Sequence, residues 1–236
     1  MIALALDTSG PVGSVAVLGG ADDAPQVLAT RTIGDGMRHG VDLFPAIEEA
    51  LRDAGVAARE IELVAVGIGP GSYTGLRVGV TAARAIAYAA GAELLGVPSC
   101  DALAAAAGDD AAGGATLAVV VDARVRAVYV ALYRACTGPD GPRWERADGP
   151  ELLPPGEAAA RIPAGALVVG DGPGAHADAF AHLRRAERPQ NAGAADIARL
   201  ALARRARGER EAIDAVEPLY LRRTEAERRL DEGGRP

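Results

Sequence analysis

Lysine is absent from this sequence of 236 residues, and all 25 basic residues are arginine. The absence excludes a Schiff-base amine, a lysine general base and the lysine of a phosphate-binding P-loop. Cysteine is scarce as well, since Cys100 and Cys136 are the only two. Two cysteines do not make a disulfide framework in a chain of this length, so we expect a reducing compartment, the cytoplasm.

Long apolar runs and a positive charge excess are also missing. No stretch approaches the roughly 18 uninterrupted apolar residues of a membrane span, and the first residues, MIALALDTSG, carry no basic region ahead of their apolar run. We therefore expect neither membrane contact nor a signal peptide. The formal net charge of −7 argues against tight binding of nucleic acid by this chain alone.

A repeated pattern within the chain is its strongest organisational feature. Residues 2–18 and residues 117–133 each begin with an apolar run closed by an aspartate, Asp7 or Asp122, followed by a short polar turn and a second apolar run. Runs of this length joined by a short turn predict two β-hairpins. The repetition indicates two similarly built halves.

Alternation of apolar strands with helices predicts an α/β fold, in which helices cover each sheet. We expect an N-terminal subdomain at 1–107, a C-terminal subdomain at 108–223 and a flexible tail at 224–236. The expected elements are strands at 26–33, 63–68, 166–169 and one ending at 97, and helices near 41–54, 74–90, 100–107 and 194–207. The region 137–165 holds six prolines and is expected to form surface loops.

A glycine loop at 67–75 joins an expected strand to a long helix. Its glycines, Gly69 and Gly71 among them, allow close backbone approach, Ser72 can cap the helix, and a helix N-terminus attracts anions. Phosphate binding and a purely structural turn both remain open, because the loop lacks the P-loop lysine. The same two readings apply to Asp7, Thr8 and Ser9, which could bind Mg²⁺ or phosphate or simply stabilise a turn.

The helix after this loop carries a row of small residues at every fourth position. Such a row forms one ridge and permits close approach of another backbone. We expect the ridge to contact a partner subunit, with packing on the protein's own sheet as the alternative. The expected interface residues are Gly75, Leu76, Gly79, Ala82, Ala83 and Ala87. On this hypothesis Gly79→Leu and Ala83→Leu abolish pairing but leave a folded monomer.

Metal and nucleophile chemistry find little support. The three histidines, His39, His176 and His182, include no pair at the spacing that places two imidazoles on one helix face. Cys100 lies among apolar residues and is expected in the core. The arginines of the C-terminal third alternate with acidic residues, which is typical of surface ion pairs, although a contribution to an RNA surface is the alternative.

Six stretches of the sequence resemble the TsaB (YeaZ) family of bacterial tRNA threonylcarbamoyladenosine biosynthesis proteins, in the family's order. They are GIGPGSYTGLRVGVTAARAIA at 67–87, ALDTSGPVGSVAV near the start, GVPSCDALA at 96–104, VVDARVRAVYVALY at 120–133, GDG at 170–172 and EPLYLRR at 217–223. The resemblance implies an actin-like, Hsp70-like sugar-kinase (ASKHA) fold with two similar halves.

The resemblance also implies an accessory role. Members of the family pair with the catalytic subunit TsaD, are joined by the ATPase TsaE, and form homodimers. Together these subunits transfer threonylcarbamoyl to the adenosine beside a tRNA anticodon. Two metal-binding histidines of TsaD correspond here to Ser99 and Leu103, so we expect no catalytic residue and no metal.

The resemblance further implies no cofactor on the isolated chain, leaves room for ATP or ADP at the complex interface, and places tRNA only within the complex. A glycoprotease-like metallopeptidase and an ASKHA small-molecule kinase are the alternatives.

Overall fold

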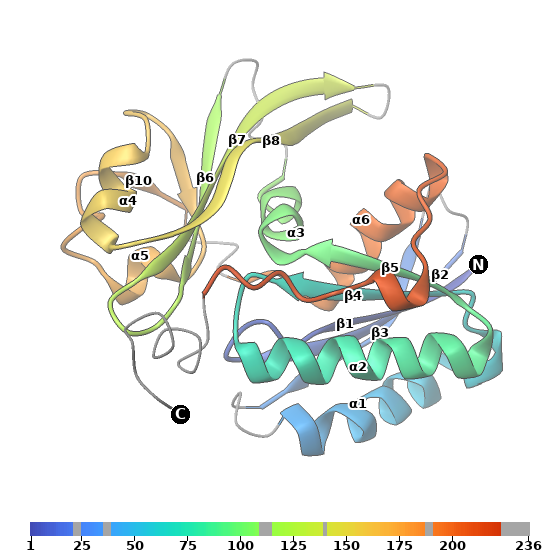
Figure 1. The fold of residues 1–236 in the computed structure, drawn as a ribbon. Coiled ribbons are helices and arrows are strands. Elements are labelled where there is room, and N and C mark those ends of the chain that lie inside the picture. The colour runs from blue at the N-terminus through green and yellow to red at the C-terminus, as the bar shows by residue number, and fades with distance from the viewer. Residues whose placement is uncertain (21–24, 35–38, 109–114, 139–140, 187–190, 223–236) are drawn as a thin grey trace.

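The computed structural model describes residues 1–20, 25–34, 39–108, 115–138, 141–186 and 191–222. Two five-stranded mixed sheets form the frame of the molecule, one at each side of the view in Figure 1. None of the helices in these ranges is both long and apolar enough to cross a membrane.

The first sheet has the strand order β3-β2-β1-β4-β5. Its strands are β1 Ile2–Asp7, β2 Gly13–Gly19, β3 Gln26–Ile33, β4 Leu63–Gly69 and β5 Glu93–Pro98. β1 and β2 form an antiparallel hairpin in which Ile2 faces Gly19 and Asp7 faces Ser14, whereas β4 and β5 run parallel to β1. The carboxyl ends of β1, β4 and β5 therefore meet at one edge of the sheet.

Both faces of the first sheet are covered by helices. Side chains alternate along each strand, so Leu4 and Leu6 face α1 His39–Ala54 and α2 Tyr73–Ala90. Ala3 and Ala5 face the other way, towards α3 Ser99–Ala106 and α6 Ala194–Ala206. Two short 3₁₀ turns, Ala58–Glu60 and Ile213–Ala215, lie in the connections.

The second sheet has the strand order β10-β9-β6-β7-β8. Its strands are β6 Thr116–Asp122, β7 Val128–Gly138, β8 Gly141–Leu153, β9 Leu167–Val169 and β10 Arg184–Arg185. α4 Pro155–Arg161 and Phe180 pack on one face, and α5 Gly172–Ala175 follows β9. As in the first sheet, an antiparallel hairpin, here β6–β7, precedes a parallel strand.

Most of the expected elements are confirmed, both hairpins included, but the expectation of surface loops at 137–165 is wrong. This region holds β8 and α4. β8 is an edge strand, where a proline such as Pro150 is tolerated because it need not donate to a further strand. Pro155 occupies the first turn of α4, where its missing N–H removes no helical hydrogen bond. The tail expected at 224–236 lies outside the described residues.

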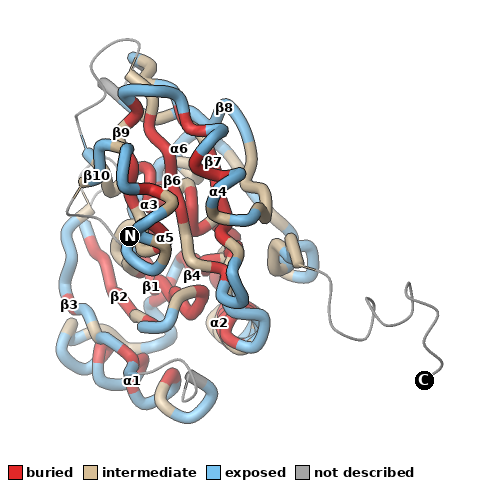
Figure 2. Tube along the Cα trace, turned by 90° about the vertical axis from the view of Figure 1, so that its left-hand side faces the viewer, coloured by how far each residue is buried: buried red, intermediate tan, exposed pale blue. Residues whose placement is uncertain are grey.

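α3 joins the two sheets. Ala102 packs on the first sheet, while Cys100, Leu103 and Ala104 pack on the second. The hydroxyl of buried Tyr133, on β7, donates a hydrogen bond to Asp101 Oδ1 at 2.7 Å. Figure 2 shows the buried residues running through the strands of both sheets.

α6 crosses between the halves of the chain. It follows the second sheet in sequence, yet its apolar side packs on the first sheet. The residues that do so are Ala194, Ile197, Ala198, Ala201 and Leu202. The C-terminal part of the chain therefore returns to the first sheet. The subdomain limits expected at 107 and 108 stay a prediction.

Candidate functional site

Four buried polar residues gather at the carboxyl edge of the first sheet. Asp7, Thr8 and Ser9 end β1 and enter its turn, and Ser99 begins α3. Among the described residues these are the buried polar or charged ones. In an open α/β sheet with parallel strands, ligands bind at this edge, so the cluster marks the candidate functional site.

Asp7 is the charged member of this cluster. The Ser9 N–H donates to Asp7 Oδ1 at 3.0 Å. Gly67 on β4 faces the same carboxylate, because a Cβ atom at Gly67 would lie 2.5 Å from Oδ1. Burial raises the pKa of Asp7 to about 6, although hydrogen bonds from Ser9 and Thr8 lower it. An acid with this pKa changes charge near neutral pH.

The glycine loop closes onto the turn after β1. A methyl group at Gly71 would overlap the Ser9 carbonyl oxygen, and the Ser72 N–H donates to that same oxygen at 2.8 Å. Gly69 has a φ of +96°, which favours glycine, and its N–H donates to Ser99 Oγ at 3.3 Å. The structural-turn interpretation thus accounts for both glycines.

Ser72 caps α2 as expected, since its Oγ accepts from the Gly75 N–H at 3.2 Å. The structure therefore brings together all six residues of the predicted phosphate or turn loop. They are Asp7, Thr8, Ser9, Gly69, Gly71 and Ser72. We call the contact between the turn after β1 and the glycine loop after β4 the junction of the first sheet. Binding of phosphate or Mg²⁺ by this junction stays a prediction.

The small-residue ridge of α2 packs inside the protein's own fold, against the end of β1. The predicted interface residues Gly75, Leu76, Gly79, Ala82, Ala83 and Ala87 are all buried in the protein's own fold. The Thr8 hydroxyl donates to the Gly75 carbonyl at 2.7 Å, and a methyl group at Gly79 would overlap that hydroxyl. The ridge lets α2 approach the end of β1 closely, so the prediction that it forms a subunit interface is wrong.

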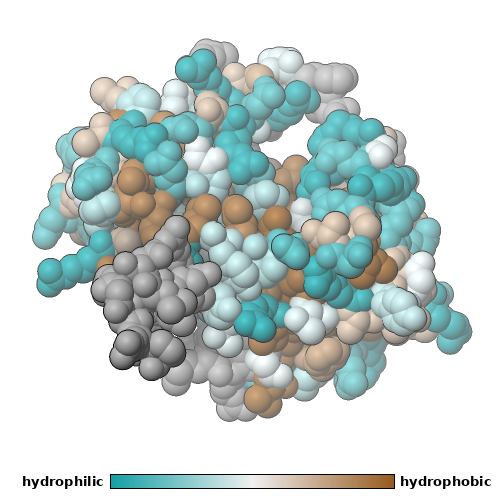
Figure 3. Space-filling view, in the orientation of Figure 1, coloured by the Kyte–Doolittle hydropathy of each residue, from teal (hydrophilic) through white to brown (hydrophobic). Residues whose placement is uncertain are grey.

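The opposite side of α2 is exposed and also carries small residues. Thr81, Ala85 and Ala89 recur at every fourth position there, and the side chain of Tyr88 is 81% exposed. α1 runs beside α2 in Figure 1 and exposes Val41 and Phe44 near its start. We call these six residues the outer face. In Figure 3 hydrophobic atoms lie at the lower edge of the molecule, over the start of α1.

A C-terminal segment, residues 213–222, runs over the carboxyl edge of the first sheet. Val216 is buried against α2 and β5, and the Leu219 N–H donates to the Ile68 carbonyl at 2.8 Å. The Tyr220 ring then packs against Tyr73, with ring centroids 4.9 Å apart. Sequence reasoning treated this stretch only as a family motif, because nothing local in it signals a long-range contact.

The second sheet has a counterpart of this junction. The Asp122 N–H donates to Asp171 Oδ1 at 2.8 Å, and His176 Nε2 lies 3.2 Å from Asp122 Oδ1. Burial raises the pKa of Asp171 above its ordinary value. The GDGPG stretch that contains Asp171 therefore acts as a turn beside β6, at the position that the glycine loop takes beside β1.

The turn between β6 and β7 is strained. Arg124, Val125 and Arg126 have φ angles of 61°, 48° and 56°, in the left-handed region that side chains other than glycine rarely adopt. Val125 is β-branched and 77% exposed, so nothing in its packing offsets the strain. Strain of this kind is concentrated at functional sites.

We predict that Val125→Gly stabilises the protein by about 1 kcal/mol, because glycine adopts a positive φ without the steric conflict of a branched Cβ. Urea unfolding would measure the change. Val12, at the turn of the other hairpin, is also exposed but has no positive φ. Val12→Gly is therefore the control and should give no stabilisation. Equal effects at both positions would contradict the assignment of strain.

The described part of the structure adds no support for a metal site or a reactive thiol. In the part of the chain that is described, no three His, Cys, Asp or Glu side chains come together as a metal site. Cys100 is confirmed as a core residue, and burial raises the pKa of its thiol to about 12. Ser99 carries a buried neutral hydroxyl, and Leu103 is buried among apolar residues and has no atom that could ligate a metal.

Several arginines of the C-terminal third, on α6 and just after it, form ion pairs, as the simpler interpretation predicted. Arg204 contacts Glu209 at 2.7 Å and Glu211 at 2.8 Å, and Arg205 contacts Glu93 at 3.0 Å. The Arg205–Glu93 pair fastens the end of α6 to β5. Because the guanidinium groups are engaged, this side of the molecule offers little free positive charge.

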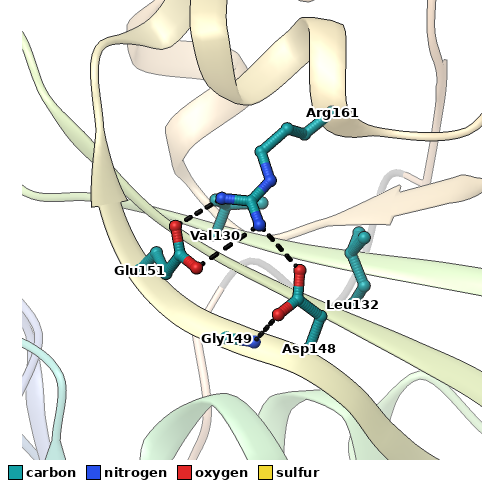
Figure 4. Close-up of a pocket in the computed structure, with 6 residues that line it drawn as sticks. All are labelled: Val130, Leu132, Asp148, Gly149, Glu151 and Arg161. Carbon is teal, nitrogen blue, oxygen red and sulfur yellow. Dashed lines mark hydrogen bonds and ion pairs between the residues drawn. The ribbon is translucent and has the colours of Figure 1, made fainter.

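A small hollow lies on the second sheet, away from both junctions (Figure 4). Arg161 reaches over β7 and β8 to pair with Asp148 and Glu151. Val130 and Leu132 line the floor. The free space of about 10 Å³ suffices for about one water molecule and excludes a substrate.

Comparisons with known proteins point in one direction. Residues 35–143 match the family model of TsaD, tRNA N6-adenosine threonylcarbamoyltransferase. A Mycobacterium tuberculosis protein of uncharacterised function is 34% identical over 227 residues, covering 94% of this chain and 92% of the relative. The tRNA threonylcarbamoyladenosine biosynthesis protein TsaB of Bacillus subtilis is 33% identical over 138 residues, 58% of this chain and 57% of its own.

Full-length similarity extends to a further TsaB protein and to solved structures. TsaB of Escherichia coli is 29% identical over 235 residues, covering 96% of this chain and 97% of its own. The structure of YeaZ from Pseudomonas aeruginosa superposes with a TM-score of 0.74 at 27% identity, over 93% of this chain and 99% of that one. A second Pseudomonas aeruginosa structure, similar to peptidase YEAZ, gives a TM-score of 0.77 at 28% identity.

Proposed function

The chain belongs to the TsaB (YeaZ) family, and from this we propose that it is an accessory subunit in tRNA threonylcarbamoyladenosine biosynthesis. In this role it binds a catalytic TsaD-like subunit, together with a TsaE-like ATPase, and enables transfer of threonylcarbamoyl to the adenosine beside the anticodon. The observation that carries the proposal is full-length similarity to a protein named TsaB.

We infer that the two sheets are the halves of an actin-like ASKHA fold, with subdomains 1–107 and 108–223. The repeated pattern of a hairpin, a parallel strand and a turn at the strand ends is compatible with this fold. In an open α/β sheet with parallel strands, ligands bind outside the carboxyl ends of the strands. Residues 213–222 reach this edge and contact Ile68 and Tyr73 there, which favours the accessory role over a kinase.

The chemistry of the cluster also supports an accessory role. A transferase or metallopeptidase of this superfamily needs metal ligands. The resemblance to the family puts Ser99 and Leu103 at the positions of the TsaD histidines, and Leu103 packs in the core. We propose that the isolated chain binds no cofactor, that ATP or ADP is held only at the complex interface, and that tRNA is held firmly only in the complex. We place the protein in the cytoplasm.

The outer face is our proposed docking surface for the TsaD-like subunit and, in its absence, for a second copy of this chain. Thr81, Ala85 and Ala89 allow a partner helix to approach closely. Phe44 and Tyr88 supply exposed aromatic surface of the kind that anchors protein interfaces.

Reconstitution tests the accessory role directly. Threonylcarbamoyl transfer to tRNA would be measured for a TsaD-like subunit with a TsaE-like ATPase, with and without this chain. We expect transfer to depend on the chain, and the chain alone to transfer nothing. An unchanged rate without the chain would overturn the proposed function, as would transfer by the chain alone.

For the docking surface we predict that Ala85→Arg weakens binding to the TsaD-like subunit about tenfold or more, because a long charged side chain at the centre of a close helix contact must be desolvated. Calorimetry would measure the affinity. Ala203 is an exposed alanine on α6, on the opposite side of the first sheet. Ala203→Arg is therefore the matched control and should bind normally. Equal weakening by both variants would contradict the assignment.

A further inference from the structure

Two tyrosines stack on the surface beside the carboxyl edge of the first sheet. Tyr73 begins α2 and Tyr220 belongs to the segment 213–222, so the chain brings them together from distant positions. Their rings lie 4.9 Å apart at an interplanar angle of 33°. They remain 43% and 46% exposed, which leaves ring surface open to solvent. Only five tyrosines occur in the chain, so such a pair uses a scarce residue.

An arginine completes this group. The guanidinium carbon of Arg77 lies 5.5 Å from the centroid of the Tyr73 ring, and Arg77 Nη1 donates to the Tyr73 hydroxyl at 2.9 Å. Unlike Arg204 and Arg205 of α6, which are partly buried against carboxylates, Arg77 is exposed and donates to a tyrosine hydroxyl. Its positive charge therefore stays available to an anionic ligand.

The strained β6–β7 turn adds positive charge next to the tyrosines. Arg222 follows Tyr220 by two residues, and its Nη1 donates to the Ala123 carbonyl at 3.3 Å, which ties the segment to this turn. Arg124 and Arg126 are both exposed at the tip of the turn.

Acidic groups also lie close to this surface. Asp122 Oδ1 accepts from the Arg124 N–H at 3.0 Å and lies beside His176, so its charge is partly satisfied. Asp171 accepts from the Asp122 N–H. Asp122 Oδ2 also lies 3.8 Å from Arg124 Nε, which offsets part of the charge of Arg124. Among the described residues, Glu217 lies near Tyr220 and opposes the remaining positive charge of Arg77, Arg126 and Arg222.

We propose that this surface, formed by Tyr73, Tyr220, Arg77, Arg124, Arg126 and Arg222, binds a single-stranded loop of RNA. Unpaired bases stack on exposed aromatic rings, and arginines contact the phosphates between them. A loop of tRNA is the RNA that the proposed function supplies, and to that extent the inference rests on it. The net charge of −7 keeps the binding weak, so it contributes to holding tRNA instead of capturing it alone.

The test is fluorescence anisotropy of the full chain with a labelled anticodon stem-loop RNA at about 50 mM salt, where phosphate contacts are strong. We expect Arg77→Glu combined with Arg126→Glu to weaken binding about tenfold and to reduce the slope of affinity against salt by about 2. A blunt duplex of the same stem, which offers no unpaired bases, should bind less tightly than the stem-loop. Equal binding of the two RNAs would overturn the stacking role.

Matched variants separate this proposal from folding effects. Arg59 is exposed in the 3₁₀ turn before β4, at the opposite edge of the sheet, so Arg59→Glu makes the same charge change far from the surface. It should weaken binding far less than Arg77→Glu. Tyr220→Phe should retain binding, while Tyr220→Ala should lose it.

The outcome is independent of reconstitution, because no TsaD-like subunit is present. Loss of binding confined to Arg77 and Arg126 would support the inference even if the chain did not activate TsaD. If Arg77→Glu and Arg59→Glu bound RNA equally, or the wild-type chain bound none, the inference would be overturned while the accessory role stood. Loss of TsaD-like subunit binding in Arg77→Glu, with RNA binding intact, would assign the surface to protein.

Discussion

Gly79→Leu is expected to destabilise the protein by about 3 kcal/mol or more. The first added carbon already overlaps the hydroxyl of Thr8, which is fully buried and hydrogen-bonded to Gly75. Relief would require α2 to move away from β1, and overpacking on that scale takes a large share of a typical folding free energy. Urea unfolding of the purified variant would measure the loss.

Thr81→Leu is the matched control, because Thr81 lies on the exposed side of the same helix. We expect it to change the free energy of unfolding by about 0.5 kcal/mol or less. A stable, folded Gly79→Leu monomer that fails only in pairing would instead restore the discarded hypothesis of a subunit interface on the ridge.

Asp7→Asn is expected to stabilise the protein at pH 8 by up to about 3 kcal/mol. The pKa of Asp7 is raised to about 6, so the folded state prefers the neutral acid. The stability that this preference contributes is fully present below the unfolded pKa near 4 and is lost as the pH rises through 6. Asparagine stays neutral and retains an oxygen to accept from the Ser9 N–H, so its stability should not fall over this range.

The measurement is urea unfolding of both proteins at pH 4 and pH 8. At pH 4 the two should differ by about 1 kcal/mol or less, since both side chains are then neutral. Comparing the two proteins at each pH removes the contribution of other titrating groups, such as Asp171. A difference between variants that is the same at both values of pH would contradict a raised pKa.

The ionised carboxylate of Asp7 lowers the stability of the folded protein, so we expect Asp7 to be retained for a function. Buried charged groups of this kind are concentrated at functional sites. Measuring the activity of Asp7→Asn in the reconstituted system would show whether the carboxylate matters beyond the turn it stabilises. Full activity in a more stable protein would assign Asp7 to the architecture of the junction alone.

Local pattern was sufficient to predict most of the elements. The apolar run closed by Asp7, and its echo at Asp122, determined two hairpins, because strand length and a short turn are local properties. The cap at Ser72 and the core position of Cys100 followed in the same way. The family, too, could be identified from the order of six sequence stretches.

Local sequence pattern did not predict those elements whose structure depends on their position in a sheet. β8 exists because an edge strand tolerates proline, and nothing in the proline-rich sequence shows that it lies at an edge. The packing of α6 on the first sheet, across more than half of the chain, was equally hidden.

By itself the sequence determined that residues 74–90 would form a helix with a row of small residues along one side, since spacing along a helix is fixed by its pitch. Only the tertiary structure decided that this row is buried. Thr8 and the end of β1 occupy the space beside Gly79, and this leaves Thr81, Ala85 and Ala89 facing outward. The pairing of Tyr73 with Tyr220 depends likewise on where a distant segment returns, which spacing along the chain does not encode.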